Sequence, residues 1–310
     1  MTSSEPATSS LNYPQNTSYH QSSNKVTLKT SITHPINVSW ILPDELKNCL
    51  TLNLLSSKLD LFDIYTSASL YQHYYYDQVE KKIQNNDNNT NEDLSSKDTS
   101  SSTTTETVSN LGNLALSSCP GKKVRLNGPE RGRATIKRDL DLDFQRLVSL
   151  GISMIICCLN DVELEFLGAP WPKYDETAQK HNIQIIRIPM IEGGCPDSLD
   201  QIDQVVLQID QHIKQGKNVL GHCRGGVGRA GLVACCWLLK TQFCLDADRA
   251  IQLVRMRRSS KAIETLQQVD FIVQYSNYVK WNLNENQKLL SKTTSNHEKD
   301  DVKEDVNNNL

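Results

Sequence analysis

The 310-residue sequence has no long apolar run and no surplus of basic residues. No stretch approaches the roughly 18 consecutive apolar residues of a membrane-spanning helix. The first residues also lack the charged-then-apolar pattern of a secretory signal, so we expect neither. The 36 acidic residues outnumber the 33 basic ones and give a net charge of −3. The composition therefore points to neither a nucleic acid nor a membrane as a partner.

The nine cysteines are an odd number, which does not suit a full set of disulfides. Four of them lie in apolar stretches, at Cys157, Cys158, Cys235 and Cys236, as free buried thiols do. Since disulfides are rare in the reducing interior of the cell, the sequence predicts a cytoplasmic or nuclear location.

The composition changes along the chain and divides it into segments. Residues 1–31 are rich in Ser, Thr, Asn and Gln, which predicts a disordered N-terminal arm. One folded domain is expected over 32–282, followed by a polar disordered tail over 283–310. Within the domain, about 43–110 is predicted to be an insertion, with a low-complexity loop at 85–107. The leucines and tyrosines before that loop predict at most weak structure.

Strand and helix patterns alternate in the rest of the chain. We expect strands at about 35–42, 111–116, 152–159, 183–188 and 218–221. We expect helices at about 140–148, 175–181, 199–213, 229–241, 246–257 and 264–282. This order predicts an α/β fold, a single mostly parallel sheet with helices on both faces. Ligands of such sheets bind beyond the carboxyl ends of the strands.

A short glycine-rich loop carries the chemistry that the sequence predicts. Cys223 and Arg229 flank five residues, three of them glycine, between the expected 218–221 strand and the helix that follows. Backbone amides in such a turn, a helix N-terminus and a planar guanidinium together bind a phosphate group. A cysteine placed there is favoured as a thiolate nucleophile. The expected phosphate-binding residues are Arg224, Gly225, Gly226, Val227, Gly228 and Arg229. The alternative is a tight turn beside a buried cysteine.

The Cys-x5-Arg spacing resembles the signature of protein tyrosine and dual-specificity phosphatases. Further segments, at 33–40, 116–122, 191–197 and 262–268, are similar to kinase-associated phosphatases. This resemblance implies a dual-specificity phosphatase-like fold and substrates that are phosphoproteins carrying phosphotyrosine, phosphoserine or phosphothreonine. It also implies a cysteinyl-phosphate intermediate, a cyclin-dependent kinase as a candidate partner, and neither a metal nor another cofactor.

Three positions depart from the family pattern. The aspartate that the family uses as general acid is Glu192 here, with Asp197 and Asp200 as the other candidates. A solvated loop carboxylate is the alternative interpretation of Glu192. The hydroxyl residue that follows the family's arginine is Ala230, which predicts a slow second step. The first of two glutamines that the family uses to position water is Glu264, and Gln268 matches the second.

These departures leave two other functions open. One is a phosphate-recognition module with little turnover, and the other is a phosphoinositide phosphatase, although the loop has none of the lysines that would favour it. Arg224 is either a substrate contact or a solvated side chain. His222 is expected to be a buried histidine that holds the loop rather than a proton donor.

Overall fold

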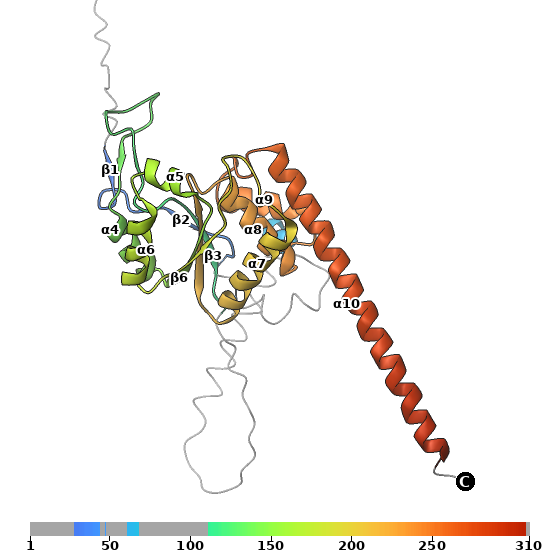
Figure 1. Cartoon of the computed structure of the whole chain (residues 1–310). Coiled ribbons are helices and arrows are strands. Elements are labelled where there is room, and N and C mark those ends of the chain that lie inside the picture. Colours follow the sequence, from blue (N-terminus) through green and yellow to red (C-terminus); the bar gives the residue numbers. More distant parts are fainter. Residues whose placement is uncertain (1–27, 44–46, 48–60, 68–110, 308–310) are drawn as a thin grey trace, which may run out of the picture.

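A computed structural model describes residues 28–43, 47, 61–67 and 111–307 (Figure 1). Its main sheet has five strands in the order β2-β3-β8-β6-β7. These are β2 (Val38–Trp40), β3 (Leu114–Ser118), β8 (Asn218–Cys223), β6 (Ile152–Cys157) and β7 (Gln184–Arg187). Only the edge strand β2 is antiparallel to its neighbour, and the other pairs are parallel. The prediction of a mostly parallel sheet is confirmed.

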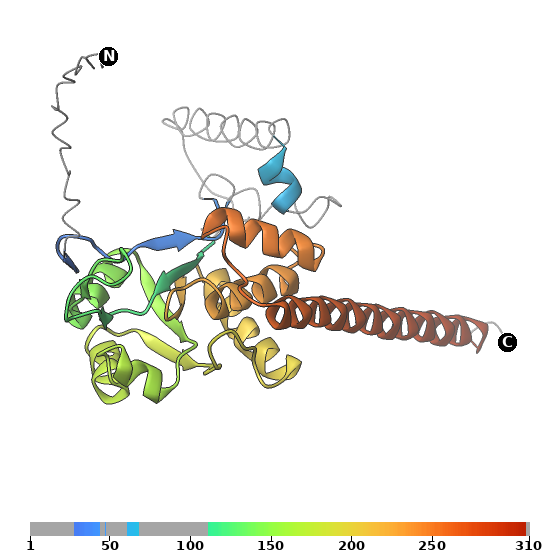
Figure 2. The same cartoon turned by 90° about the horizontal axis from the view of Figure 1, so that it is seen from above.

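Helices cover both faces of this sheet, as predicted (Figures 1 and 2). One group consists of α4 (Leu140–Ser149), α5 (Asp161–Phe166) and α6 (Trp171–Lys180). The other consists of α7 (Leu199–Lys214), α8 (Arg229–Lys240), α9 (Ala247–Arg257) and α10 (Leu266–Asn307). Every residue of α8 from Arg229 to Leu239 is buried, because α7, α9 and α10 all pack around it. The strand and helix that flank the glycine-rich loop therefore lie at the centre of the core.

A second, smaller sheet departs from the prediction of a single sheet. It contains β1 (Lys29–Thr30), β5 (Ile136–Lys137) and β4 (Lys123–Val124). Strands of two residues are too short for an alternating pattern to reveal them. Because β1 pairs with β5, the predicted disordered arm over 1–31 is wrong at its end. Its first 27 residues lie outside the described part of the chain.

The insertion predicted over 43–110 lies mostly outside the described residues, including the 85–107 loop. One part of it, α2 (Leu61–Thr66), is a helix. Leu61 and Ile64 are buried in the main core, and α2 packs against α9. This part of the predicted insertion therefore belongs to the folded body.

Two helix boundaries also differ from the predictions. Helix α6 begins at Trp171, inside a segment expected to be a loop, because Pro172 occupies a first-turn position where a proline is tolerated. Helix α10 continues to Asn307, so the tail predicted as disordered over 283–310 is helical through most of its length. No glycine or proline interrupts it after residue 266. None of the described helices is both long and apolar enough to cross a membrane.

Candidate active site

The glycine-rich loop joins the end of β8 to the start of α8, at the carboxyl edge of the sheet. Cys223 is the last residue of β8 and is only 3% exposed. The backbone N–H of Gly226 donates to Cys223 Sγ at 3.2 Å. Gly226 has a φ of +70°, and a Cβ there would overlap the carbonyl of Ser117 on β3. Only glycine fits at this position, so the sequence fixes the turn that aims an amide at the sulfur.

Arg258 holds the loop from behind. Its guanidinium donates to the carbonyl oxygens of Gly225 at 3.0 Å and Gly226 at 2.9 Å, and to Ser39 Oγ at 3.1 Å. In a trans peptide the N–H points away from the C=O, so these contacts turn the next two N–H groups to the opposite side. Burial lowers the pKa of Arg258, although the nearby Cys223 opposes this shift. Arg258 was not predicted as a site residue, because no motif in the sequence links the end of α9 to the glycine-rich loop.

Arg229 is fixed by a bidentate ion pair. Both of its terminal nitrogens donate to the Glu163 carboxylate at 2.8 Å, and one also donates to the Met190 carbonyl at 2.7 Å. Burial alone would lower the pKa of Arg229, but the hydrogen bonds to Glu163 and the proximity of Cys223 raise it overall. Glu163 is itself held by a capping box with Asn160 at the start of α5. The Ser/Thr/Asn/Asp-x-x-Glu pattern at Asn160 indicates the start of a helix, and α5 is absent from the helices predicted above.

A cavity of about 320 Å³ opens over Cys223. Cations outnumber carboxylates among the residues that line it, so it suits an anion. Its lining residues are Lys122, Val124, Arg125, Arg133, Glu192, Cys223, Arg224, Gly225, Val227, Arg229 and Glu264. Of the predicted phosphate-binding residues, only Gly226 and Gly228 do not line it. The Lys122 ammonium donates to the Arg224 carbonyl at 2.9 Å, and burial lowers its pKa.

Of the three candidate general acids, only Glu192 lies at the cavity. Glu192 lines the cavity, with its side chain 66% exposed, and pairs with the Arg224 guanidinium at 3.1 Å. Asp197 and Asp200 do not line it. Both are exposed, and Asp200 accepts a hydrogen bond from the Tyr278 hydroxyl at 2.8 Å. The structure brings Glu192 together with Cys223 and Arg229 and leaves the two aspartates outside.

The two positions expected to handle water have different surroundings. Glu264 lines the cavity, and its carboxylate lies so close to Gly228 that a Cβ there would overlap it. Gln268 is fully buried and does not line the cavity. Its amide donates to the Gly194 carbonyl at 3.1 Å and accepts from the Glu264 N–H at 2.9 Å. Gln268 thus ties the segment after Glu192 to α10.

His222 is a structural histidine in this geometry, as the sequence analysis expected. It is completely buried, and its Nε2 lies 2.9 Å from the Tyr174 hydroxyl. Burial lowers its pKa to about 3, so the ring is neutral near pH 7. The neutral ring links β8 to α6 beneath the loop.

Part of the chain is similar to known proteins. Residues 142–278 match the family model described as dual specificity phosphatase, catalytic domain. Cyclin-dependent kinase inhibitor 3 from Homo sapiens is 29% identical over 165 residues, which are 53% of this chain and 71% of that protein. The Rattus norvegicus protein of the same name is 28% identical over the same coverage.

Among solved structures, kinase associated phosphatase with its catalytic-site cysteine replaced by serine is similar at 26% identity and a TM-score of 0.48. That match covers 54% of this chain and 88% of the other. Residues 142–278 therefore match the catalytic domain of the dual specificity phosphatases, and the chain resembles cyclin-dependent kinase inhibitor 3.

Proposed function

We propose that this chain hydrolyses phosphotyrosine, phosphoserine or phosphothreonine on proteins through a cysteinyl-phosphate intermediate. The observation that carries the proposal is the position of Cys223. Its sulfur lies at the floor of a cation-rich cavity, accepts a loop N–H, and shares the cavity with the fixed guanidinium of Arg229. The thiolate is the nucleophilic form of a cysteine. A cavity of this kind binds the phosphate and presents phosphorus to the nucleophile.

In the first step the Cys223 thiolate attacks phosphorus and the bond to the ester oxygen breaks. Arg229 and the loop amides stabilise the negative charge on the phosphoryl oxygens. Glu192, as the carboxylic acid, gives its proton to the departing oxygen. Glu192 forms an ion pair with Arg224, and this ion pair must open when the phosphate takes over Arg224. Substrate binding and release of the acid are therefore coupled.

In the second step water attacks the cysteinyl-phosphate, and Glu192 accepts a proton from that water. The S–P bond breaks and the electron pair returns to sulfur. Ala230 offers no hydroxyl to the departing thiolate, whereas the Gly226 N–H already donates to this sulfur and can stabilise its charge. This step is expected to be the slower one.

The proposed substrate is a phosphoprotein, with a cyclin-dependent kinase as the candidate partner. Support for the kinase comes from the names of the relatives, cyclin-dependent kinase inhibitor 3 and kinase associated phosphatase. An intracellular location, cytoplasmic or nuclear, is proposed from the cysteine pattern alone.

A second candidate is a phosphate-recognition module with little turnover. Glu264 favours it, because this residue of the cavity wall stands where the phosphatases that the chain resembles have a glutamine that positions the attacking water. Release of inorganic phosphate separates the two functions. We expect the purified chain to release phosphate from a panel of phosphopeptides, and Cys223→Ser to bind them without release.

Phosphoinositide vesicles belong in the same panel, since they test the lipid alternative. Binding without phosphate release by the unaltered chain would favour the recognition module. Release by Cys223→Ser would defeat the covalent mechanism.

A further inference from the structure

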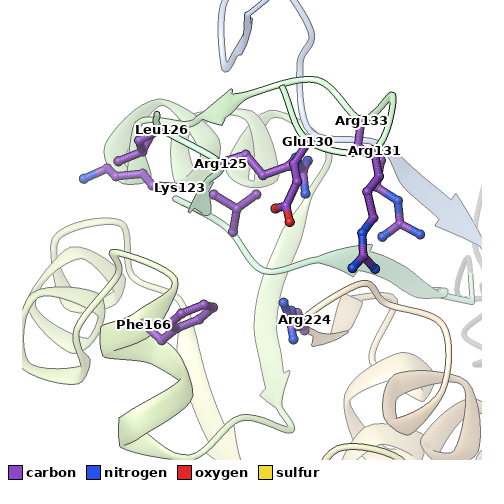
Figure 3. A pocket seen from close by; sticks show the side chains of 9 residues that line it. Lys123, Arg125, Leu126, Glu130, Arg131, Arg133, Phe166 and Arg224 are labelled. Atoms are coloured by element: carbon purple, nitrogen blue, oxygen red, sulfur yellow. The ribbon is translucent and has the colours of Figure 1, made fainter. Parts of the chain in front are cut away.

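A second cavity, of about 490 Å³, adjoins the active-site cavity (Figure 3). The segment that contains β4 and runs on to β5 supplies most of its wall, and Arg224 and Phe166 lie opposite. Its lining residues are Lys123, Val124, Arg125, Leu126, Glu130, Arg131, Arg133, Phe166 and Arg224. Four of these, Val124, Arg125, Arg133 and Arg224, also line the cavity over Cys223. The two cavities are therefore contiguous, and we call the second one the basic pocket.

The basic pocket carries positive charge that its surroundings leave uncompensated. Glu130 is its single carboxylate, against one lysine and four arginines. Arg224 pairs with Glu192, but within the described part of the chain no carboxylate forms an ion pair with Lys123, Arg131 or Arg133. This concentration of cations occurs in a chain whose net charge is −3. A group of guanidinium ions, most of them without a carboxylate partner, suits the binding of an anion.

The backbone in this wall gives a second, independent reason for a ligand. Arg125 and Arg131 both have left-handed conformations, with φ of +55° and +48°. Arg131 is followed by Gly132 at +72°, in a tight turn closed by two hydrogen bonds between Glu130 and Arg133. Glycine or asparagine suits both central positions of such a turn better than arginine. Backbone strain of this kind clusters at functional sites, and here it is borne by residues that bring cations to the pocket.

We propose that the basic pocket binds a second phosphate group on the same protein segment whose phosphoresidue enters the active site. This inference rests on the proposed function. One arginine guanidinium can bind two oxygens of a phosphate at once, and four arginines line this pocket. Arg224 contacts both cavities, so one guanidinium lies between the two phosphates. The exposed ring of Phe166 lies under Arg224, 5.7 Å from its guanidinium carbon, and provides an apolar surface for the residues between them.

A peptide is favoured over a phosphoinositide headgroup by the charges of the active-site loop and its rim. No lysine lies between Cys223 and Arg229, and Glu192 and Glu264 face the same cavity. These carboxylates repel a ring that carries several phosphates close together, whereas a peptide separates its two phosphates along an extended chain.

Peptides with one and two phosphates test the proposal. A set carries the second phosphate at each of five positions on either side of the first, and a matched set carries only one. Binding to Cys223→Ser is measured by fluorescence anisotropy, and turnover of the unaltered chain by phosphate release. We call the position of the second phosphate relative to the first the register of the peptide. We expect peptides of one register to bind and react about tenfold better than their singly phosphorylated counterparts, as a pair of charge-assisted contacts gives. Other registers carry the same charge and should gain little.

Arg131→Gly is the decisive variant. Glycine suits the turn better than arginine, and Arg131 does not line the active-site cavity, so folding and turnover of singly phosphorylated peptides should not change. The preferred register should lose most of its advantage. Lys217→Ala is the matched control, because it also removes one positive charge. Lys217 directly precedes β8, at the opposite end of the strand from Cys223. It should retain the preference.

Three results would overturn the proposal. They are equal binding of all registers, an unchanged preference in Arg131→Gly, and an effect of Arg131→Gly only on phosphoinositide vesicles. Failure of the proposed function looks different. The unaltered chain would then release no phosphate from any peptide, while register-dependent binding to Cys223→Ser would still support the basic pocket.

Discussion

At the scale of single residues, the proposed mechanism makes Ala230 a determinant of the step that regenerates the thiolate. It is fully buried at the start of α8, directly after Arg229. Because it has no hydroxyl, we expect breakdown of the cysteinyl-phosphate to limit turnover. Rapid mixing with an aryl phosphate should show a burst of phenol near one per enzyme and then slow release. Ala230→Ser should accelerate the slow phase roughly threefold to tenfold, the worth of one hydrogen bond, without changing the burst. A linear progress curve would contradict this account.

The geometry of Arg229 matters as much as its charge. Its two nitrogens engage Glu163 in parallel, and a lysine cannot reproduce that fork. Arg229→Lys should lower kcat/KM by at least about 100-fold, as loss of one transition-state donor does. It should also lower the free energy of unfolding by about 1–3 kcal/mol, because Glu163 loses a partner. Steady-state kinetics and urea unfolding measure the two effects. A nearly normal rate would show that Arg229 does not contact the phosphate.

His222 gives the stability of the fold a dependence on pH. Its pKa is about 3 in the folded chain and near 6.5 when unfolded. Between these values the unfolded chain binds a proton that the folded chain does not, so stability falls as the pH is lowered through this window. From pH 7 to pH 5 this one group should cost about 2 kcal/mol, at about 1.4 kcal/mol per unit below 6.5.

Urea unfolding of the unaltered chain and of His222→Gln, at both pH values, isolates this contribution. The glutamine can still hydrogen-bond to Tyr174 but does not titrate. The difference in stability between the two proteins should narrow as the pH falls. A constant difference would mean that His222 can take up a proton in the folded state.

At the scale of elements, the phosphate loop depends on one glycine more than on its neighbour. Gly226 has a positive φ and lies against the Ser117 carbonyl, whereas a Cβ on Gly225 would meet only Val227 Cγ2 at an ordinary 3.8 Å. Gly226→Ala should therefore cost at least about 1–3 kcal/mol of stability and most of the activity. Gly225→Ala is the matched control and should keep both within a few-fold. Thermal unfolding measures the loss of stability, and aryl phosphate hydrolysis measures the loss of activity. Equal losses in Gly226→Ala and Gly225→Ala would contradict the role given to the Ser117 contact.

The same elements show what the sequence could predict. The apolar run at 152–159 and the glycine-rich loop have local patterns, and both are where the patterns indicated. Arg258 and Glu163 support the loop from α9 and α5, and only the fold brings them to it. The small sheet was not predicted, because each of its strands is only two residues long. Helix α5 was not predicted although its capping box was visible, because the helix is only six residues long.

At the scale of the whole molecule, compositional boundaries and folding boundaries do not coincide. The segment 43–110 has the composition of an insertion, yet α2 within it buries Leu61 and Ile64 in the main core. The Leu61 N–H also donates to the Phe243 carbonyl at 2.7 Å, beyond the end of α8. Among the α10 residues whose burial is described, Val279 is the last buried one, and the helix continues to Asn307 and projects away from the body (Figures 1 and 2).

Two changes within 43–110 should therefore have opposite outcomes. Deleting residues 85–107 removes a polar segment, and shortening a long loop changes its closure entropy by less than about 1 kcal/mol. Melting temperature and aryl phosphate hydrolysis should remain close to those of the unaltered chain. Ile64→Ala instead leaves a cavity between α2 and α9 and should cost about 2–5 kcal/mol. Calorimetry distinguishes the two. Should the deletion destabilise the chain as much as Ile64→Ala, residues 85–107 would have to pack against the core, and the whole segment would be part of the domain.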